Sequence, residues 1–196
     1  TLAALDAAPR RAAADEAVRL LRRVQEAGGL PGAEPTARMR ACYNDVLGVL
    51  SGGDEARRAV ELLREMQRFG PAPDAASYRA AIIASSSSTS SVPPPSGGAE
   101  RALSLLSELE AAPGLEADAR AYVACMQACR RAGAWGEAID LLRRMAERGL
   151  PPNSYAYSTA VSACADGGDW VRALQLLEEM AARGAAPSVH AYAAAI

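Results

Sequence analysis

The feature that most constrains the fold is a repeat of 35 residues in the second half of the chain. Several positions between 119 and 188 recur at this spacing: Tyr122 with Tyr157, Gly133 with Gly168, Trp135 with Trp170, Ala138 with Ala173, Met145 with Met180, Gly149 with Gly184, and Pro152 with Pro187. A constant period of this length marks stacked repeat architectures, in which each unit contacts its neighbours. We therefore expect a row of similar units rather than one domain around a single core.

Each unit contains two predicted helices. The first covers residues 120–131 in one copy and 155–165 in the next. The second carries apolar residues on one helical face, because they are spaced three, four and seven apart. These residues are Ala138, Leu141, Leu142 and Met145 in one copy and Ala173, Leu176, Leu177 and Met180 in the next.

Glycines end the second helices of the unit. Gly149 and Gly184 follow the last apolar positions, and a proline comes three residues after each. This is the arrangement expected of a helix C-cap. The unit is thus helix, turn, helix and capped turn, and a single hairpin of this kind needs neighbours to bury its apolar faces.

The composition agrees with packed helices. Half of the residues are hydrophobic but only 5% are aromatic, and alanine supplies much of the hydrophobic share. A β-sandwich or barrel would favour β-branched and aromatic residues. Charged residues make up 22% of the chain, and no uncharged apolar run is long enough to predict a membrane span.

These motifs resemble a known family. A tyrosine near the start of the first helix, Ala-x-x-Leu-Leu-x-x-Met in the second and a closing Gly-x-x-Pro-x, all at a period of 35, resemble the pentatricopeptide repeat. The tetratricopeptide repeat has a period of 34 and a different pattern of tryptophan and glycine. The resemblance implies an all-α fold, a right-handed α-solenoid (superhelix) of stacked antiparallel helical hairpins.

The repeat boundaries follow from this register. We expect whole repeats at 40–74, 75–118, 119–153 and 154–188, with partial repeats at 1–39 and 189–196. Both ends fall inside repeats, so we expect a segment of a longer solenoid. The same seam pattern recurs at Ala17, Leu20, Leu21 and Val24, at Ala59, Leu62, Leu63 and Met66, and at Ala102, Leu105, Leu106 and Leu109.

Two stretches interrupt or compete with the repeat pattern. Ser85–Gly98 is rich in Ser, Pro and Gly, and this composition predicts a disordered loop between the two helices of its repeat. Pro9, Arg10 and Arg11 are followed by alanines, as in an organellar transit peptide, but Asp15 and Glu16 and the repeat register favour a solenoid helix.

Catalytic, metal and cofactor sites find little support. Cys125 and Cys129 are four apart, but Cys129 and Cys164 are one repeat apart, so they occupy equivalent positions and are expected to pack in the helix seam with Cys42 as small apolar residues. There is no Cys-x-x-Cys pair, a single histidine and no phosphate-binding loop with lysine. We expect no catalytic residues, no metal, no cofactor and no small-molecule substrate.

The resemblance implies a binding function, because pentatricopeptide repeats read about one RNA base each with two or three side chains. The implied base-reading pairs are Asn44 with Asp74, Arg79 with Asp118, Val123 with Asn153, and Ser158 with Ser188. The implied residues that pack on bases are Ala41, Ala76, Arg120, Tyr155 and His190. The alternative is that these are simply polar or small residues at helix starts.

The implied pairs differ in quality. Asn44 with Asp74 matches a pair that the family uses for uridine, and Ser158 with Ser188 is a loose match. Arg79 is long and charged, and Val123 cannot form a hydrogen bond with a base. One good pocket does not define a target sequence.

The implied partner is single-stranded RNA, and the implied setting is organellar RNA metabolism: stabilisation, processing, splicing or translation of transcripts in a chloroplast or mitochondrion. The alanine-rich, lysine-free composition favours the chloroplast. The alternative is a protein-interaction scaffold, for example on a ribosome. A net charge of −2 and a pI of about 5.5 favour that alternative, because nucleic-acid-binding domains are usually basic.

Overall fold

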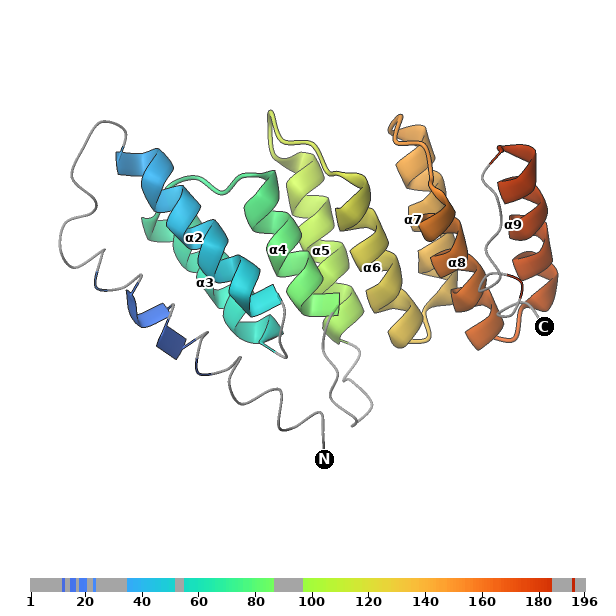
Figure 1. The fold of residues 1–196 in the computed structure, drawn as a ribbon, viewed down its shortest axis with the longest axis horizontal. Coiled ribbons are helices and arrows are strands. Elements are labelled where there is room, and N and C mark those ends of the chain that lie inside the picture. Colours follow the sequence, from blue (N-terminus) through green and yellow to red (C-terminus); the bar gives the residue numbers. More distant parts are fainter. Residues whose placement is uncertain are drawn as a thin grey trace.

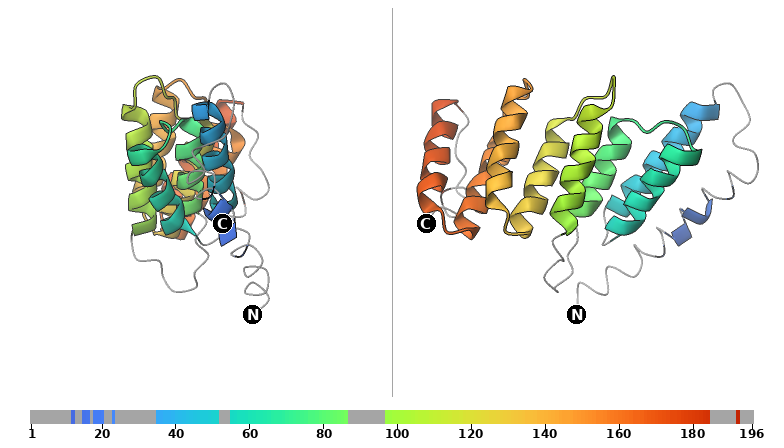
Figure 2. Two further views of the ribbon diagram at one scale, coloured as in Figure 1. Left: turned by 90° about the vertical axis from the view of Figure 1, so that its left-hand side faces the viewer. Right: turned by 180° about the vertical axis from the view of Figure 1, so that it is seen from behind.

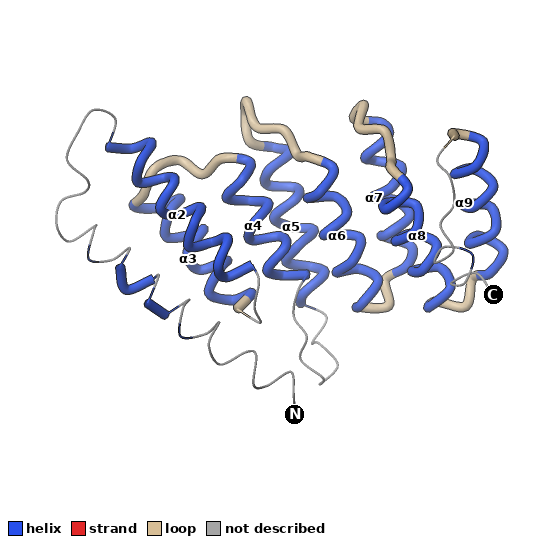
Figure 3. The backbone as a smooth tube through the Cα atoms, viewed as in Figure 1, coloured by secondary structure: helices blue, strands red, loops and turns tan. Residues whose placement is uncertain are grey.

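The computed structural model describes residues 35–51, 55–86 and 97–184, together with a few isolated positions between 12 and 23 and Tyr192. Within these residues the regular structure is entirely α-helical, and short turns connect the helices (Figure 3). None of the helices in this part of the chain is both long and apolar enough to cross a membrane.

The helices follow one another as antiparallel hairpins in a single row (Figure 1). The first helices of the repeats are α2 (Pro35–Ser51), α4 (Ala75–Ser86), α6 (Ala119–Arg131) and α8 (Ser154–Asp166). The second helices are α3 (Ala56–Phe69), α5 (Gly97–Ala111), α7 (Trp135–Glu147) and α9 (Trp170–Ala182). The predicted all-α solenoid of hairpins is confirmed.

The two sets of helices pack differently. The backbone of each first helix packs against the first helix of the next repeat, in the order α2, α4, α6 and α8, whereas among the described residues the backbones of successive second helices lie farther apart and side chains bridge them (Figure 2). Small side chains allow the close approach of the first helices. The row of first helices is therefore the tightly packed, inner side of the solenoid, and the second helices form its outer side.

The predicted seams of the second helices are confirmed in all four described repeats. Each seam residue is at most 6% exposed. They are Ala59, Leu62, Leu63 and Met66 in α3, Ala102, Leu105, Leu106 and Leu109 in α5, Ala138, Leu141, Leu142 and Met145 in α7, and Ala173, Leu176, Leu177 and Met180 in α9. Burial of these side chains is what holds neighbouring hairpins together.

The glycines that end α7 and α9 adopt the predicted cap. Gly149 has a φ of 75° and Gly184 a φ of 73°, a left-handed conformation that glycine adopts without steric cost. After Gly149 the amide of Leu150 donates to the carbonyl of Met145 at 3.1 Å, which closes the helix end. Gly70 is different, since its φ is −101° and two prolines follow within three residues.

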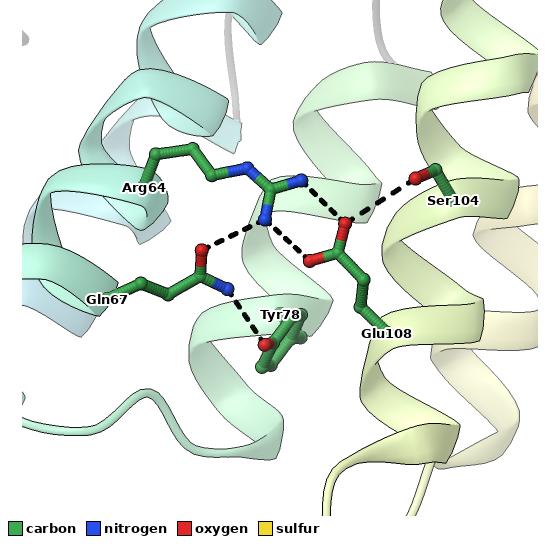
Figure 4. Close-up of polar contacts among 5 residues, drawn as sticks. All are labelled: Arg64, Gln67, Tyr78, Ser104 and Glu108. Atoms are coloured by element: carbon green, nitrogen blue, oxygen red, sulfur yellow. Dashed lines mark hydrogen bonds and ion pairs between the residues drawn. The ribbon is translucent and has the colours of Figure 1, made fainter.

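Polar side chains bridge the second helices on the outer side. Arg64 of α3 donates two hydrogen bonds to Glu108 of α5, at 2.7 and 2.5 Å (Figure 4). Gln67 accepts from the same guanidinium at 2.9 Å and donates to the Tyr78 hydroxyl, also at 2.9 Å. Because the backbones of α3 and α5 lie too far apart to pack closely, these long side chains make the contact between the two helices.

The next junction uses a buried carboxylate. The Glu110 side chain is only 3% exposed, and it receives the hydroxyl of Tyr122 and the guanidinium groups of Arg144 and Arg148. Asp140 and Arg144 are four residues apart in the sequence, a spacing that predicts an ion pair on their own helix. That was wrong: Arg144 reaches the preceding repeat, and Asp140 lies 3.9 Å from Arg143 instead.

The predicted insert is shorter than expected. Ser85 and Ser86 continue α4 and are buried, and Gly97 and Gly98 begin α5. The helix satisfies the buried Ser85 hydroxyl internally, because this hydroxyl donates to the Ala81 carbonyl one turn earlier at 2.9 Å. The remainder, 87–96, lies outside the described residues, and its disorder stays a prediction.

The seam expected near the N-terminus is only partly testable, because Ala17, Leu21 and Val24 lie outside the described side chains. Leu20 was expected in the seam but is 50% exposed, whereas Val18 packs against the cluster around Tyr43. The expected face was therefore wrong at Leu20.

Candidate nucleic-acid interface

The positions implied to read bases gather where the first helices begin. In the repeats that end at Asp74, Asp118 and Asn153, the last residue directly precedes the next first helix, and its side chain caps that helix. Asp118 Oδ1 accepts from the amide of Ala121 at 2.9 Å, and Asn153 Oδ1 accepts from the amide of Ala156, also at 2.9 Å. Asp74 Oδ1 accepts likewise from Ser77 at 2.9 Å. These residues are thus N-caps as well as candidate base readers.

Asn44 and Asp74 come together as implied. The Asn44 amide nitrogen lies 3.2 Å from Asp74 Oδ1 and 3.3 Å from Oδ2, across thirty residues of sequence. Burial opposes ionisation of Asp74, but hydrogen bonds from Ser77 and Asn44 and the nearby Arg40 outweigh it and hold the pKa of Asp74 below its ordinary value. The carboxylate is therefore charged at neutral pH and accepts the amide hydrogen.

Arg79 and Asp118 also meet, as an ion pair. Arg79 Nη1 lies 2.7 Å from Asp118 Oδ2, and both side chains are partly exposed. Asp118 uses its other oxygen to cap α6. The two implied base readers of this repeat thus bind each other, and a base would have to compete with the ion pair.

Val123 and Asn153 are not arranged as a polar reading pair. Val123 is 7% exposed and belongs to the main core cluster, while Asn153 is exposed and caps α8. The Ser158 hydroxyl donates to the Ser154 carbonyl one turn earlier, at 2.8 Å. Its implied partner Ser188 lies outside the described residues, as does His190.

The described residues that are implied to pack on bases lie in the first helices: Ala41 in α2, Ala76 in α4, Arg120 in α6 and Tyr155 in α8. Tyr155 is 58% exposed, and its hydroxyl accepts from Gln127 of α6 at 2.6 Å, so the ring spans two first helices. Arg120 is exposed, Ala41 is exposed and Ala76 is half-buried. Tyr155 and Arg120 thus offer an exposed aromatic ring and an exposed cation one repeat apart.

Two residues near these positions were missed by the sequence argument, namely Ser77 and Gln127. Ser77 is fully buried and contacts both members of the Asn44–Asp74 pair. A signal for it was present, because Asp74-x-x-Ser77 has the spacing of a reciprocal helix cap. Gln127 had no such signal, since its contact with Tyr155 depends on how two repeats stack.

Fold and candidate interface together define a helical-repeat solenoid in which side chains cap the N-termini of the first helices α4, α6 and α8. Models of the pentatricopeptide (PPR) repeat match the chain in both halves. The PPR repeat family model matches residues 117–166, and the PPR repeat model matches residues 41–71 and 155–184. The chain belongs to the PPR repeat family.

Solved structures with the same fold include two proteins. The chain superposes on the PPR domain of Arabidopsis thaliana protein-only RNase P 1, determined in complex with tRNA, with a TM-score of 0.69 and 18% identity, over 80% of this chain and 78% of that one. It superposes on maize PPR10 with a TM-score of 0.67 and 26% identity, over 96% of this chain and 24% of that one.

PPR10 has also been determined with an 18-nucleotide psaJ RNA element, and there the TM-score is 0.67 with 18% identity, over 89% of this chain and 23% of that one. The chain thus spans about a quarter of PPR10. No curated protein sequence matches the chain.

Proposed function

We propose that this chain binds single-stranded RNA along the inner side formed by its first helices. The observation that carries the proposal is the contact between Asn44 and Asp74, at 3.2 Å, in the positions that the family uses to read uridine. Two side chains from successive repeats meet there at the start of a first helix. An amide supplies both a hydrogen-bond donor and an acceptor, which is what recognition of a base edge needs.

Affinity in this proposal comes mainly from contacts that do not discriminate between bases. Tyr155 offers an exposed ring, and stacking of a base on an aromatic side chain contributes about 1–3 kcal/mol. Arg120 is exposed one repeat earlier and can contact a phosphate or stack on a base. Arg79 is held by Asp118 and Val123 is buried, so their repeats would contribute little specificity.

A protein-interaction scaffold is the second candidate. It is favoured by the net charge of −2 and by the occupied Arg79–Asp118 pair, because neither helps to attract a polyanion. The same inner side would then hold a peptide or a ribosomal protein.

Binding measured across a salt series distinguishes the two candidates. The probe is a labelled, unstructured RNA oligonucleotide, and the control is the same assay with Arg120→Ala. RNA binding through phosphates releases counterions, so the logarithm of the affinity should fall linearly as the logarithm of salt concentration rises. Arg120→Ala should reduce that slope. Absence of binding at low salt would reject the RNA proposal.

The proposed place of action is a chloroplast or mitochondrion, where the chain would stabilise, process, splice or help to translate transcripts. This part of the proposal is supported by membership of the PPR family and by a composition without lysine. It is tested by imaging the full-length protein fused to a fluorescent reporter. A cytosolic or nuclear signal would contradict it.

A further inference from the structure

Ser77 forms a closed group with Asn44 and Asp74. Its hydroxyl donates to the Asn44 carbonyl oxygen at 2.6 Å, and its backbone amide donates to Asp74 Oδ1 at 2.9 Å. The backbone amide of Asp74 in turn donates to the Ser77 hydroxyl oxygen at 3.2 Å. Ser77 is fully buried, so it does not itself face a ligand on the surface.

The hydroxyl hydrogen has two acceptors within reach. Asn44 Oδ1 is at 2.6 Å and Asp74 Oδ1 is at 3.0 Å. Asp74 Oδ1 already accepts from the Ser77 amide and from the Asn44 side chain, whereas Asn44 Oδ1 is the nearer oxygen. A hydroxyl has one hydrogen to donate, and the shorter distance assigns it to Asn44.

These contacts fix which way the Asn44 amide faces. In the observed orientation its nitrogen meets the Asp74 carboxylate and its oxygen meets the Ser77 hydroxyl. A half-turn of the amide would place its carbonyl oxygen against the charged carboxylate and would leave that carboxylate without the amide hydrogen. One amide hydrogen and one lone pair of Oδ1 remain available in a fixed order.

The order of donor and acceptor distinguishes the two pyrimidines. Uracil presents a carbonyl acceptor beside the N3–H donor, whereas cytosine presents an amino donor beside the N3 acceptor. An amide that suits one base in a given pose therefore suits the other only after a half-turn. When the wrong base binds, a buried polar group of the site is left without a hydrogen-bond partner, and the site therefore discriminates against that base.

We infer that Ser77, from the repeat after Asn44, is a specificity-positioning residue that makes this pocket prefer uridine over cytidine. The inference rests on the proposed RNA-binding function. It is particular to this pocket, because the equivalent positions of the next two repeats are Ala121 and Ala156, which have no hydroxyl. The backbone amides of those alanines donate to the capping side chains of Asp118 and Asn153. Alanine is therefore compatible with the fold at this position.

The test compares two RNA probes that differ only by uridine or cytidine at the register read by Asn44. Affinities of the full chain for both are measured by fluorescence anisotropy, with Ser77→Ala and with Ser77→Thr, which keeps the hydroxyl. The control is Ser85→Ala, which removes from the same helix a buried hydroxyl that donates to the Ala81 carbonyl. Thermal melts verify that each variant is folded.

Ser77→Ala is expected to lower the ratio of uridine to cytidine affinity about two- to tenfold, which corresponds to the net free energy of one hydrogen bond. The affinity for the uridine probe itself should change less than this ratio. Ser77→Thr and Ser85→Ala should keep the wild-type ratio. If Ser77→Ala keeps that ratio while Asn44→Ala abolishes it, the inference is wrong and the proposed function stands. If the wild-type chain binds neither probe, both are wrong.

Discussion

The indole ring of Trp135 lies so close against Gly167 that a Cβ atom at position 167 would collide with the ring's Cγ and Cδ1 atoms. Trp135 begins the second helix of one repeat, and Gly167 ends the first helix of the next. The contact therefore fixes the spacing of two successive repeats at one end of the hairpins. A solenoid depends on many such local contacts, because each repeat touches only its neighbours.

Gly167→Ala should destabilise the protein by about 1–3 kcal/mol, the usual cost of inserting atoms into a well-packed site. Gly136→Ala is the matched control, since nothing lies within 4 Å of its added Cβ and alanine in a helix gains roughly 0.5–1 kcal/mol over glycine. Urea unfolding followed by circular dichroism measures both. A Gly167→Ala variant as stable as the wild type would contradict the contact.

Leu142→Ala should cost roughly 2–5 kcal/mol of unfolding free energy, because the side chain is 4% exposed and its removal leaves a cavity in the seam. Arg143→Ala, at the next position but exposed, should stay within about 0.5 kcal/mol. The two variants are compared in denaturant melts. A larger loss for the arginine variant would mean that the assigned helical face is wrong.

The Arg64–Glu108 pair should make the free energy of unfolding depend on pH in the acid range. Its hydrogen bonds hold the pKa of Glu108 below the ordinary value of 4.5. The pair's contribution to stability is therefore present above pH 4.5. It is lost as the pH falls from there through the lower pKa that Glu108 has in the folded protein.

Glu108→Gln should lower stability at pH 7 by about 1 kcal/mol or less, since both side chains are partly exposed. It should also flatten the fall in melting temperature below pH 4.5. Glu147→Gln changes an exposed carboxylate on α7 and should keep the wild-type slope. An unchanged slope in Glu108→Gln would show that the pair is not stabilising.

The cysteines should differ in reactivity. Cys125, Cys129 and Cys164 are free and buried, whereas Cys42 is half-buried. Burial raises the pKa of Cys129 and of Cys164 to about 11, and only the thiolate reacts readily. At pH 8 an alkylating reagent should modify Cys42 first and the other three only after unfolding. Mass spectrometry of the labelled protein measures this, and rapid labelling of Cys164 in the folded chain would be contrary to the expectation.

The fold was predictable from the sequence because its elements are local and repeated. The spacing of Leu141, Leu142 and Met145 predicts a buried helix face without any knowledge of the adjacent repeats. Gly149 marks the end of the same helix. Arg144 was misassigned because a long side chain can reach either its own helix or the next one. Only the stacking distance between repeats decides between Asp140 and Glu110.

The contacts among the candidate base-reading residues were only partly predictable from the sequence. The repeat register located Asn44 and Asp74, which do meet. It could not reveal that Arg79 forms an ion pair with Asp118, or that Val123 is buried in the core, since both depend on how neighbouring repeats pack. Ser77 was visible only as a helix-capping residue, and its contact with Asn44 arises from tertiary packing.

The measurement that tests the central proposal most directly is in vitro selection of RNA by the full chain, repeated with Asn44→Ala. The wild-type chain should select RNAs with uridine at one fixed register, since Asn44 and Asp74 form the one pocket that matches a known reading pair. Asn44→Ala should lose that preference and keep most of the affinity, because stacking on Tyr155 is indifferent to base identity. Selected RNAs without uridine at a fixed register, or an unchanged preference in Asn44→Ala, would contradict the account.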